Sequence, residues 1–477
     1  MTEATATALN QQDTVIGESS DGRLPSSFRD PGGFLFMRDQ VLYRQVNRSH
    51  QRHYDLLQDS GLYKELISRG LLIPHEEVSL DSGSQRAYKT LKPEVIPFVS
   101  YPYEWSFSQL QDAALVTLRV QKLAVQFGMS LKDTSAYNIQ FKAGKPVLID
   151  TLSLEGLVEG APWVAYRQFC QHFLGPLALM GCVDARLGQL LRVHIDGVPV
   201  DLTSRLLSWR KYSSFSLLLH LHLHALAQRR LNAKANPTGL RRLSRSGLFG
   251  LIDNLETAVR RLRWEPQQIN WVRYYEHERC QAAAFQEKSR IVADWLDKMV
   301  PAVQSIWDFG ANTGHFSRLA SQRGIFTVSI DADAACVEMN YKECGRQGET
   351  RLLPLLLDLT NPSAAKGWQN RERMSLLERG PADLAFALAI VHHLAISNNL
   401  PFRKIAEFFS GCCKRLMIEF IPKTDLQVQR MLDTRVDIFG EYTQQAFEHE
   451  FSQVFSLRER APITGSGRTL YLMEKVT

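Results

Sequence analysis

The second half of the chain alternates short apolar runs with amphipathic segments. From residue 305 onward, runs such as SIW (305–307) and IFTVSI (325–330) are separated by stretches with apolar residues at helical spacing. Regular alternation of strands and helices is typical of a parallel sheet with helices on both faces. Residues 247–300, just upstream, read as helical. The pattern predicts an α/β fold, with a doubly wound domain over residues 265–477.

The first half has a less regular pattern. Residues 25–227 mix short strand-like runs with helical segments, which predicts a separate α+β domain. Residues 1–24 are polar and predict a disordered leader. The stretch QRRLNAKANPTGLRRLSRS (228–246) holds six basic residues and no acidic one. We interpret residues 228–264 as a basic linker and helix between the two domains.

Composition narrows the class of protein. The chain has 477 residues, of which 44% are hydrophobic and 22% charged, as in globular proteins of two or three domains. The net charge of +6 is mild, and the basic stretch lacks interleaved aromatics, which argues against nucleic-acid binding. The most apolar stretch, FSLLLHLHLHALA (215–227), is too short to span a bilayer. The N-terminus lacks signal-peptide features, and the seven cysteines contain no CxxC pair, so we expect a cytoplasmic protein without a metal site.

One stretch, SIWDFGANTGHFSRLASQRGIFTVSID (305–331), predicts a strand, a glycine-rich turn, a helix and a second strand. Gly310 permits a sharp turn, and Gly314 removes a Cβ where the backbone would approach a ligand. The second strand ends in Asp331, whose carboxylate suits the two hydroxyls of a ribose. The glycine spacing differs from the G-x-G-x-x-G of dinucleotide sites, and Asp308 would repel a pyrophosphate. The layout therefore favours a nucleoside at the carboxyl ends of the strands.

The residues DFGANTG (308–314) resemble motif I of the class I S-adenosylmethionine-dependent methyltransferases, in its D-x-G-x-N-x-G variant. The resemblance covers roughly residues 265–477 and implies a Rossmann-like fold with a helical lid before the motif. It implies S-adenosyl-L-methionine as the cofactor. The cofactor would be bound by Asp308, Gly310, Asn312, Gly314, Asp331 and Asp358, with Asp358 on the adenine amine.

Later strand ends supply candidates for catalysis. His392 and His393 follow ADLAFALAIVHHL, which we interpret as the fourth strand and its exit. CKRLMIEFIPKTD predicts a fifth strand that ends in Glu419. An imidazole titrates near neutral pH, so either histidine is a candidate general base, with Glu419 orienting it or contacting the acceptor. A structural histidine pair is the alternative interpretation.

The first half contains a second pattern, in SLKDTSAYNIQFKAGKPVLID (130–150). Asp133 precedes Asn138, and an apolar run then ends in Asp150, which resembles the catalytic and metal-binding positions of kinase-like phosphotransferases. Arg44 occupies the place of the phosphate-anchoring lysine, and no Phe-Gly pair follows Asp150. The resemblance implies a degenerate, non-catalytic kinase-like fold for residues 25–227.

Over nearly its whole length the chain resembles bacterial class I methyltransferases of the rhizobial nodulation-protein type, through SFRDPGGFLF, YPYEWSF, LKDTSAYNIQF and ALAIVHHLAI. The first hypothesis is a methyltransferase whose N-terminal domain aids recognition of an unidentified acceptor. The alternatives are an ATP-dependent phosphotransferase or bifunctional enzyme, and a non-catalytic scaffold that binds a nucleoside. Neither the acceptor nor the oligomeric state follows from the sequence.

Overall fold

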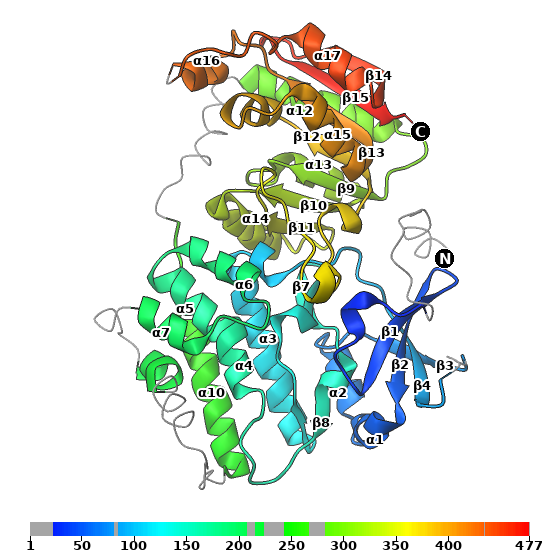
Figure 1. Ribbon diagram of the computed structural model, residues 1–477, viewed down its shortest axis with the longest axis vertical. Coiled ribbons are helices and arrows are strands. Elements are labelled where there is room, and N and C mark those ends of the chain that lie inside the picture. The colour runs from blue at the N-terminus through cyan, green and yellow to red at the C-terminus, as the bar shows by residue number, and fades with distance from the viewer. Residues whose placement is uncertain are drawn as a thin grey trace. The chain divides into compact units, whose positions relative to one another are not determined.

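The structure is a computed structural model of the chain, and it describes residues 22–80, 84–207, 215–223, 243–266, 282–433 and 435–476. It forms two compact units (Figure 1). The C-terminal unit contains Pro266–Lys366 and Arg373–Thr477, and the N-terminal unit contains Val15–Glu265 and Gly367–Glu372. Most of the expected leader and basic linker, and the first part of the expected lid, lie outside the described residues.

The N-terminal unit begins with an antiparallel sheet in the order β1-β2-β4-β3. The β1–β2 hairpin turns at Asp39 and Gln40, both with positive φ, which is the backbone of a tight hairpin turn. Two short helices follow, separated at Gly61, which has φ of 83°. The bounds are β1 (Gly33–Arg38), β2 (Val41–Asn47), α1 (Gln51–Asp59), α2 (Leu62–Ser68), β3 (His75–Val78) and β4 (Ala87–Pro93).

A long buried helix, α3 (Phe107–Gln126), forms the centre of the N-terminal unit's helical part. Its first turn is closed by a capping box, in which the Ser106 hydroxyl accepts from the amide of Gln109 and the Gln109 side-chain oxygen accepts from the amide of Ser106. Helix α10 (Arg245–Arg261) packs along α3 and is held there by bonds from Gln111 to two carbonyls. The remaining elements are β5 (Met129–Leu131), β6 (Ile139–Lys142), β7 (Lys145–Leu148), β8 (Leu154–Gly156), α4 (Tyr166–Phe169), α5 (Gly175–Cys182), α6 (Leu190–Val193), α7 (Val200–Leu206) and α8 (Phe215–Leu217).

The C-terminal unit is built on a seven-stranded sheet in the order β11-β10-β9-β12-β13-β15-β14. Strands β11, β10, β9, β12 and β13 run parallel, and β15 and β14 complete the sheet in antiparallel pairing. The bounds are β9 (Ser305–Phe309), β10 (Phe326–Asp331), β11 (Leu352–Leu356), β12 (Ala382–Ala387), β13 (Cys413–Phe420), β14 (Phe455–Pro462) and β15 (Thr469–Lys475). The chain leaves β9 toward β10 on one side and returns to β12 on the other, which makes β9 and β12 the topological switch point.

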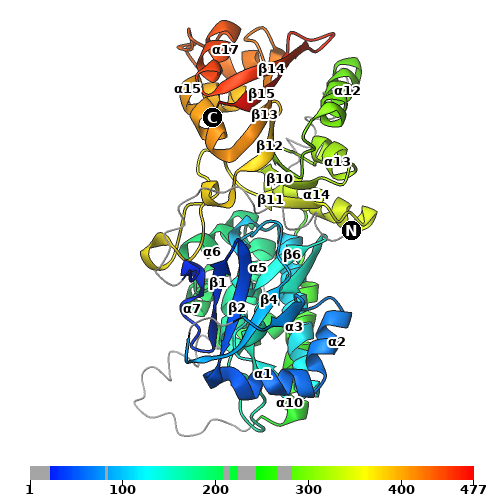
Figure 2. The same cartoon turned by 90° about the vertical axis from the view of Figure 1, so that its right-hand side faces the viewer.

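Helices cover both faces of this sheet (Figure 2). One face carries Ile306, Phe386 and Met417, which pack in one core cluster with Val292 and Trp295 of α12. The helices on this face are α12 (Ala282–Lys298), α13 (His315–Ser321) and α14 (Ala334–Gln347). The other face is covered by α15 (Phe402–Cys412) and α17 (Gln444–Ser452), while α16 (Leu426–Leu432) follows β13.

The predicted doubly wound α/β domain is confirmed. The first, second, fourth and fifth strands lie where the apolar runs place them, and β10 ends at Asp331 as predicted. The N-terminal unit is α+β in content, but a kinase-like fold is not shown and stays a prediction.

Candidate functional site

The glycine-rich loop between β9 and α13 is held tightly to the neighbouring strand. The amides of Gly310 and Ala311 both donate to the carbonyl of Ile330 on β10, at 2.9 and 3.0 Å. Gly310, Asn312 and Gly314 all have positive φ, of 71°, 52° and 82°. A Cβ at position 314 would lie 2.6 Å from the Asn340 side chain. Glycine is therefore required at 314 by the protein's own packing as well as by the backbone angle.

Asp331 closes this loop from the end of β10. One carboxylate oxygen accepts from the amide of Asn312 at 2.7 Å, and the other accepts from the amide of Asp333 at 2.8 Å. Burial raises the pKa of Asp331 to about 6, although these backbone amides act in the opposite direction. A carboxylate has about four acceptor positions, so two bonds leave capacity for the hydroxyls of a ribose.

Asp308, the first residue of the motif, lies beneath the loop and is buried. Its carboxylate accepts from the Ser317 hydroxyl at 2.5 Å, and Ser317 lies 3.0 Å from the Ser329 hydroxyl on β10. Burial raises the pKa of Asp308 to about 7, with the Ser317 bond and the charge of Lys288 opposing it. The structure therefore places Asp308 in an internal network that supports the loop.

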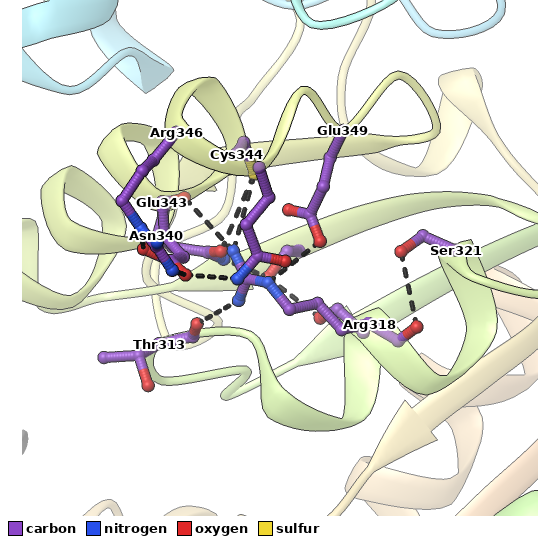
Figure 3. Close-up of polar contacts among 11 residues, drawn as sticks. Thr313, Arg318, Ser321, Asn340, Glu343, Cys344, Arg346 and Glu349 are labelled. Carbon is purple, nitrogen blue, oxygen red and sulfur yellow. Dashed lines mark hydrogen bonds and ion pairs between the residues drawn. The ribbon is translucent and has the colours of Figure 1, made fainter.

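Arg318 braces the same loop from α13 (Figure 3). Its guanidinium donates to the carbonyl of Thr313 at 2.6 Å and forms an ion pair with Glu349 at 3.0 Å. Asn340 of α14 lies beside it and donates to Ser329 at 2.8 Å. The loop conformation thus depends on side chains from α13, α14 and the segment after α14, which the motif alone does not contain.

Asp358 lies apart from this network. It comes two residues after β11 and is exposed, and its carboxylate accepts from the amide and the hydroxyl of Thr360 at 2.8 and 2.7 Å. This is the geometry of a turn stabilised by an aspartate. Its predicted contact with an adenine amine stays a prediction.

His392 and His393 follow β12 and lie with their ring centroids 4.1 Å apart. His392 is completely buried, and within the described part of the chain neither of its ring nitrogens has a hydrogen-bond partner. Burial lowers its pKa well below the usual value, and the charges of Arg468 and Lys288 act in the same direction. Burial also lowers the pKa of His393. His392 is therefore a neutral imidazole at physiological pH.

Glu419 near the end of β13 belongs to a charged cluster that sequence reasoning missed in part. Its carboxylate is fully buried and accepts from Lys288 of α12 at 2.5 Å. Arg468, just before β15, lies 3.6 Å from the other oxygen and donates to Asp425 at 2.8 Å. One sequence signal for Lys288 exists, because it falls on the apolar stripe of α12 between Phe285 and Val292.

Strand register shows how these groups relate. Asp308 pairs with Phe386, and Phe386 pairs with Met417, so all three point to the same face of the sheet. Glu419 lies two positions beyond Met417 and shares that face. The strands carrying Asp308 and Glu419 are two steps apart, about 10 Å. The loop and the Glu419 cluster therefore lie at one edge of the sheet, on the face covered by α12 and α13.

The arrangement fits the nucleoside cofactor predicted from the motif. The loop bends at the switch point of the sheet, where ligands of doubly wound folds bind. Asp331 retains acceptor capacity at the end of the adjacent strand. The described ranges contain no group of three or more histidine, cysteine, aspartate or glutamate residues arranged to hold a metal ion.

The candidate residues of the N-terminal unit are engaged with protein partners. Asp150 pairs with Arg44 through one oxygen and accepts from the Ser153 hydroxyl through the other, at 2.5 Å for Ser153. Burial opposes ionisation of Asp150, but Arg44 and Ser153 together lower its pKa. Asp133 accepts from Gln168 at 2.8 Å, and Asn138 donates to Ser153 at 3.3 Å. The structure thus brings Asn138 and Asp150 together through Ser153.

Comparison with known proteins gives one relative over the full length. No protein-family model matches the chain. It is 32% identical over 470 residues to the nodulation protein NoeA of Rhizobium meliloti (strain 1021), covering 97% of this chain and 98% of that protein. None of the helices that the structure describes is both long and apolar enough to cross a membrane.

Solved methyltransferase structures are similar to part of this chain. Magnesium protoporphyrin IX methyltransferase (ChlM) from Synechocystis PCC 6803, with bound SAH, is 15% identical with a TM-score of 0.30, covering 44% of this chain and 90% of that one. The N-methyltransferase NodS from Bradyrhizobium japonicum WM9, in complex with S-adenosyl-L-homocysteine, is 13% identical with a TM-score of 0.31, covering 41% and 88%. Likenesses this weak carry no argument about substrates.

Proposed function

Since the chain belongs to the family of the nodulation protein NoeA, we propose that it methylates a small-molecule acceptor. It is a class I methyltransferase with S-adenosyl-L-methionine as its cofactor. When bound, this cofactor supplies a methyl group activated on a sulfonium. The protein's own residues hold the nucleoside, exclude water and align the acceptor, since orientation alone contributes ~7–11 kcal/mol to such reactions.

The main support for the proposal is the hydrogen bond between the glycine-rich loop, at Asn312, and the carboxylate of Asp331. The loop is bonded to β10 at Ile330, and Asp331 accepts from Asn312 while keeping acceptor positions for ribose hydroxyls. Both lie at the switch point, where a doubly wound sheet binds nucleosides. Asp308 supports the loop from below through Ser317.

His392, His393 and Glu419 are the candidates for handling the acceptor proton. His392 is neutral at physiological pH, so its ring has a nitrogen able to accept a proton. Its low pKa makes it a weak base, because general bases work best with a pKa near the operating pH. Glu419 has a carboxylate oxygen that accepts no hydrogen bond from any described residue. We therefore propose that Glu419 contacts the acceptor and that His392 is not the main general base.

The N-terminal unit, in this proposal, aids acceptor recognition. We do not extend the proposal to phosphoryl transfer. Asp150 is paired with Arg44, and this fixed positive charge disfavours a metal ion at the same carboxylate. The kinase-like fold and its candidate residues Asp133 and Asn138 remain predictions.

The test is calorimetric titration with S-adenosylhomocysteine, comparing the parent with Asp331→Asn, Asp358→Asn and Asp297→Asn. The parent is expected to bind. Asp331→Asn loses charge-assisted bonds to the ribose worth ~1.5–3 kcal/mol, so its affinity falls at least about tenfold. Asp358→Asn tests the predicted adenine contact, and its affinity also falls if that contact exists. The matched control is Asp297→Asn, at an exposed carboxylate of α12 that pairs with Arg323, and it retains the parent's affinity within about twofold.

A parent protein that ignores both S-adenosylmethionine and S-adenosylhomocysteine would refute the proposed activity. If the nucleoside binds but no labelled methyl reaches any fraction of a cell extract, the non-catalytic scaffold is correct instead. If Asp358→Asn loses affinity and Asp331→Asn does not, the assignment of the ribose contact is wrong while the activity stands.

A further inference from the structure

A small pocket lies beside Glu419 on the face of the sheet covered by α12. Its lining includes Lys288, Glu419 and Arg468 on the polar side and Ala284, Phe285 and Ile463 on the apolar side. Its volume is about 20 Å³, and a cavity of ~10–15 Å³ is enough for one water. The pocket is therefore large enough for one functional group of a molecule but not for a whole molecule.

On the polar side of the pocket, the carboxylate of Glu419 can accept a hydrogen bond from a further donor. Glu419 is fully buried; one of its oxygens accepts from Lys288, and the other accepts no hydrogen bond from the described part of the chain. A buried carboxylate oxygen is rarely left without a donor in native proteins. This oxygen has an ion pair with Arg468 at 3.6 Å but no hydrogen bond, so an O–H or N–H group of a ligand in the pocket can donate to it.

The charges around the pocket select among donors. Lys288 and Arg468 contribute two positive charges to the lining and Glu419 contributes one negative charge, so a protonated amine is disfavoured. Lys288 already donates to Glu419 and Arg468 already donates to Asp425, so a carboxylate would compete with the protein's own acidic groups. A neutral hydroxyl satisfies Glu419 without either conflict.

The pocket also lies within electrostatic range of the cofactor motif. The charge of Lys288 acts on Asp308 beneath the glycine-rich loop and on His392 beyond β12. Lys288 itself stacks over the ring of Phe316, the second residue of α13, at 4.7 Å. The same lysine thus links the loop, the buried histidine and Glu419.

We propose that this pocket is the acceptor subsite and that it takes a neutral hydroxyl group carried next to an apolar surface. The proposal rests on the proposed function, and names the acceptor class of that site. Glu419 accepts from the hydroxyl, while Lys288 and Arg468 are positioning residues that hold the carboxylate. Phe285 and Ile463 contact the adjoining apolar part.

The test uses three small probes matched in shape: benzyl alcohol, benzylamine and benzoate. Their binding to the full chain saturated with S-adenosylhomocysteine is followed by saturation-transfer NMR. Benzyl alcohol is expected to give the strongest signal. Ala284→Leu, at a half-buried position on α12, fills the pocket and reduces that signal at least fivefold. The control, Ala283→Leu, adds the same side chain at the exposed neighbouring position and leaves it unchanged.

Glu419→Gln removes the negative charge of the lining, so the preference shifts from benzyl alcohol toward benzoate. If this variant does not fold, the two alanine variants decide alone. The inference is overturned if no probe binds, if Ala284→Leu leaves the signal unchanged, or if benzylamine or benzoate binds the parent more strongly. Calorimetry separates this from the proposed function: if the parent does not bind S-adenosylhomocysteine, the activity is refuted rather than the subsite.

Discussion

The pKa of Asp308 is raised because folding buries its carboxylate away from water. The residue is 2% exposed, and its carboxylate accepts a hydrogen bond from the Ser317 hydroxyl. In the folded protein Asp308 therefore has a pKa of about 7, whereas the ordinary value for an aspartate is 3.8. Between these two values the folded state holds more protons than the unfolded state. Raising the pH through this window consequently lowers the free energy of unfolding.

Asp308→Asn removes this titration. The free energy of unfolding of the variant relative to the parent is expected to rise from about pH 4 to about pH 7, by up to ~4 kcal/mol, and to level off above. Denaturant unfolding at a series of pH values measures the difference. The contributions of Asp331 and His392 are present in both proteins and largely cancel. A constant difference across the window would show that Asp308 has an ordinary pKa.

At the scale of elements, the loop between β9 and α13 owes its shape to the helices behind it. Arg318 holds the carbonyl of Thr313 and pairs with Glu349, with side-chain exposures of 13% and 10% for the pair. Asn340 fills the space that a Cβ at Gly314 would occupy. Because Arg318 bonds directly to the loop, we expect that loss of the Arg318 side chain also weakens binding at the predicted nucleoside site.

Arg318→Ala leaves Glu349 buried without its partner. Breaking a buried ion pair costs ~3–5 kcal/mol, and partial exposure places this case near the lower end. We expect the free energy of unfolding to fall by about 3 kcal/mol and the affinity for S-adenosylhomocysteine to fall about tenfold. Denaturant unfolding and calorimetric titration measure the two effects.

The matched control is Arg346→Ala on α14, visible in the same view (Figure 3). Arg346 is exposed and pairs with Glu343 on its own helix, and such pairs contribute little. It should behave like the parent in both measurements. If both variants lose the same stability and affinity, the general loss of positive charge causes the effect, and the contact between Arg318 and the loop does not.

At the scale of the whole molecule, the chain consists of two compact units with separate cores. Large proteins of this kind commonly unfold in more than one transition. The glycine-rich loop, Asp331 and the pocket beside Glu419 all belong to the C-terminal unit. A ligand that binds there stabilises only the unit that holds it.

Differential scanning calorimetry is therefore expected to show two transitions. S-adenosylhomocysteine at about 100 times its dissociation constant stabilises the C-terminal unit by ~2.7 kcal/mol and raises one transition temperature. The other transition stays in place. Asp331→Asn at the same ligand concentration should show a reduced shift.

Magnesium–ATP in the same experiment addresses the phosphotransferase alternative. Asp150 is already paired with Arg44, so we expect neither transition to move. A shift of the second transition that disappears in Asp150→Ala would restore the kinase-like hypothesis for the N-terminal unit.

The amino-acid sequence by itself determined the local features of this protein. The alternation of apolar runs and helical segments specified the α/β domain, because the spacing of apolar residues within a short segment distinguishes a strand from a helix. The glycines at 310 and 314 and the acidic residue that ends β10 are likewise local, since a turn and its neighbouring strand lie close in the chain. The motif therefore predicts a nucleoside site from consecutive residues alone.

Only the tertiary structure decided which distant side chains meet. Lys288 and Glu419 are separated by 131 positions, and Arg468 reaches Glu419 from the segment just before β15. Their pairing, the burial of His392 and the raised pKa of Asp308 depend on desolvation and charge at short range. Those quantities arise only when the helices close over the sheet, so no stretch of consecutive residues contains them.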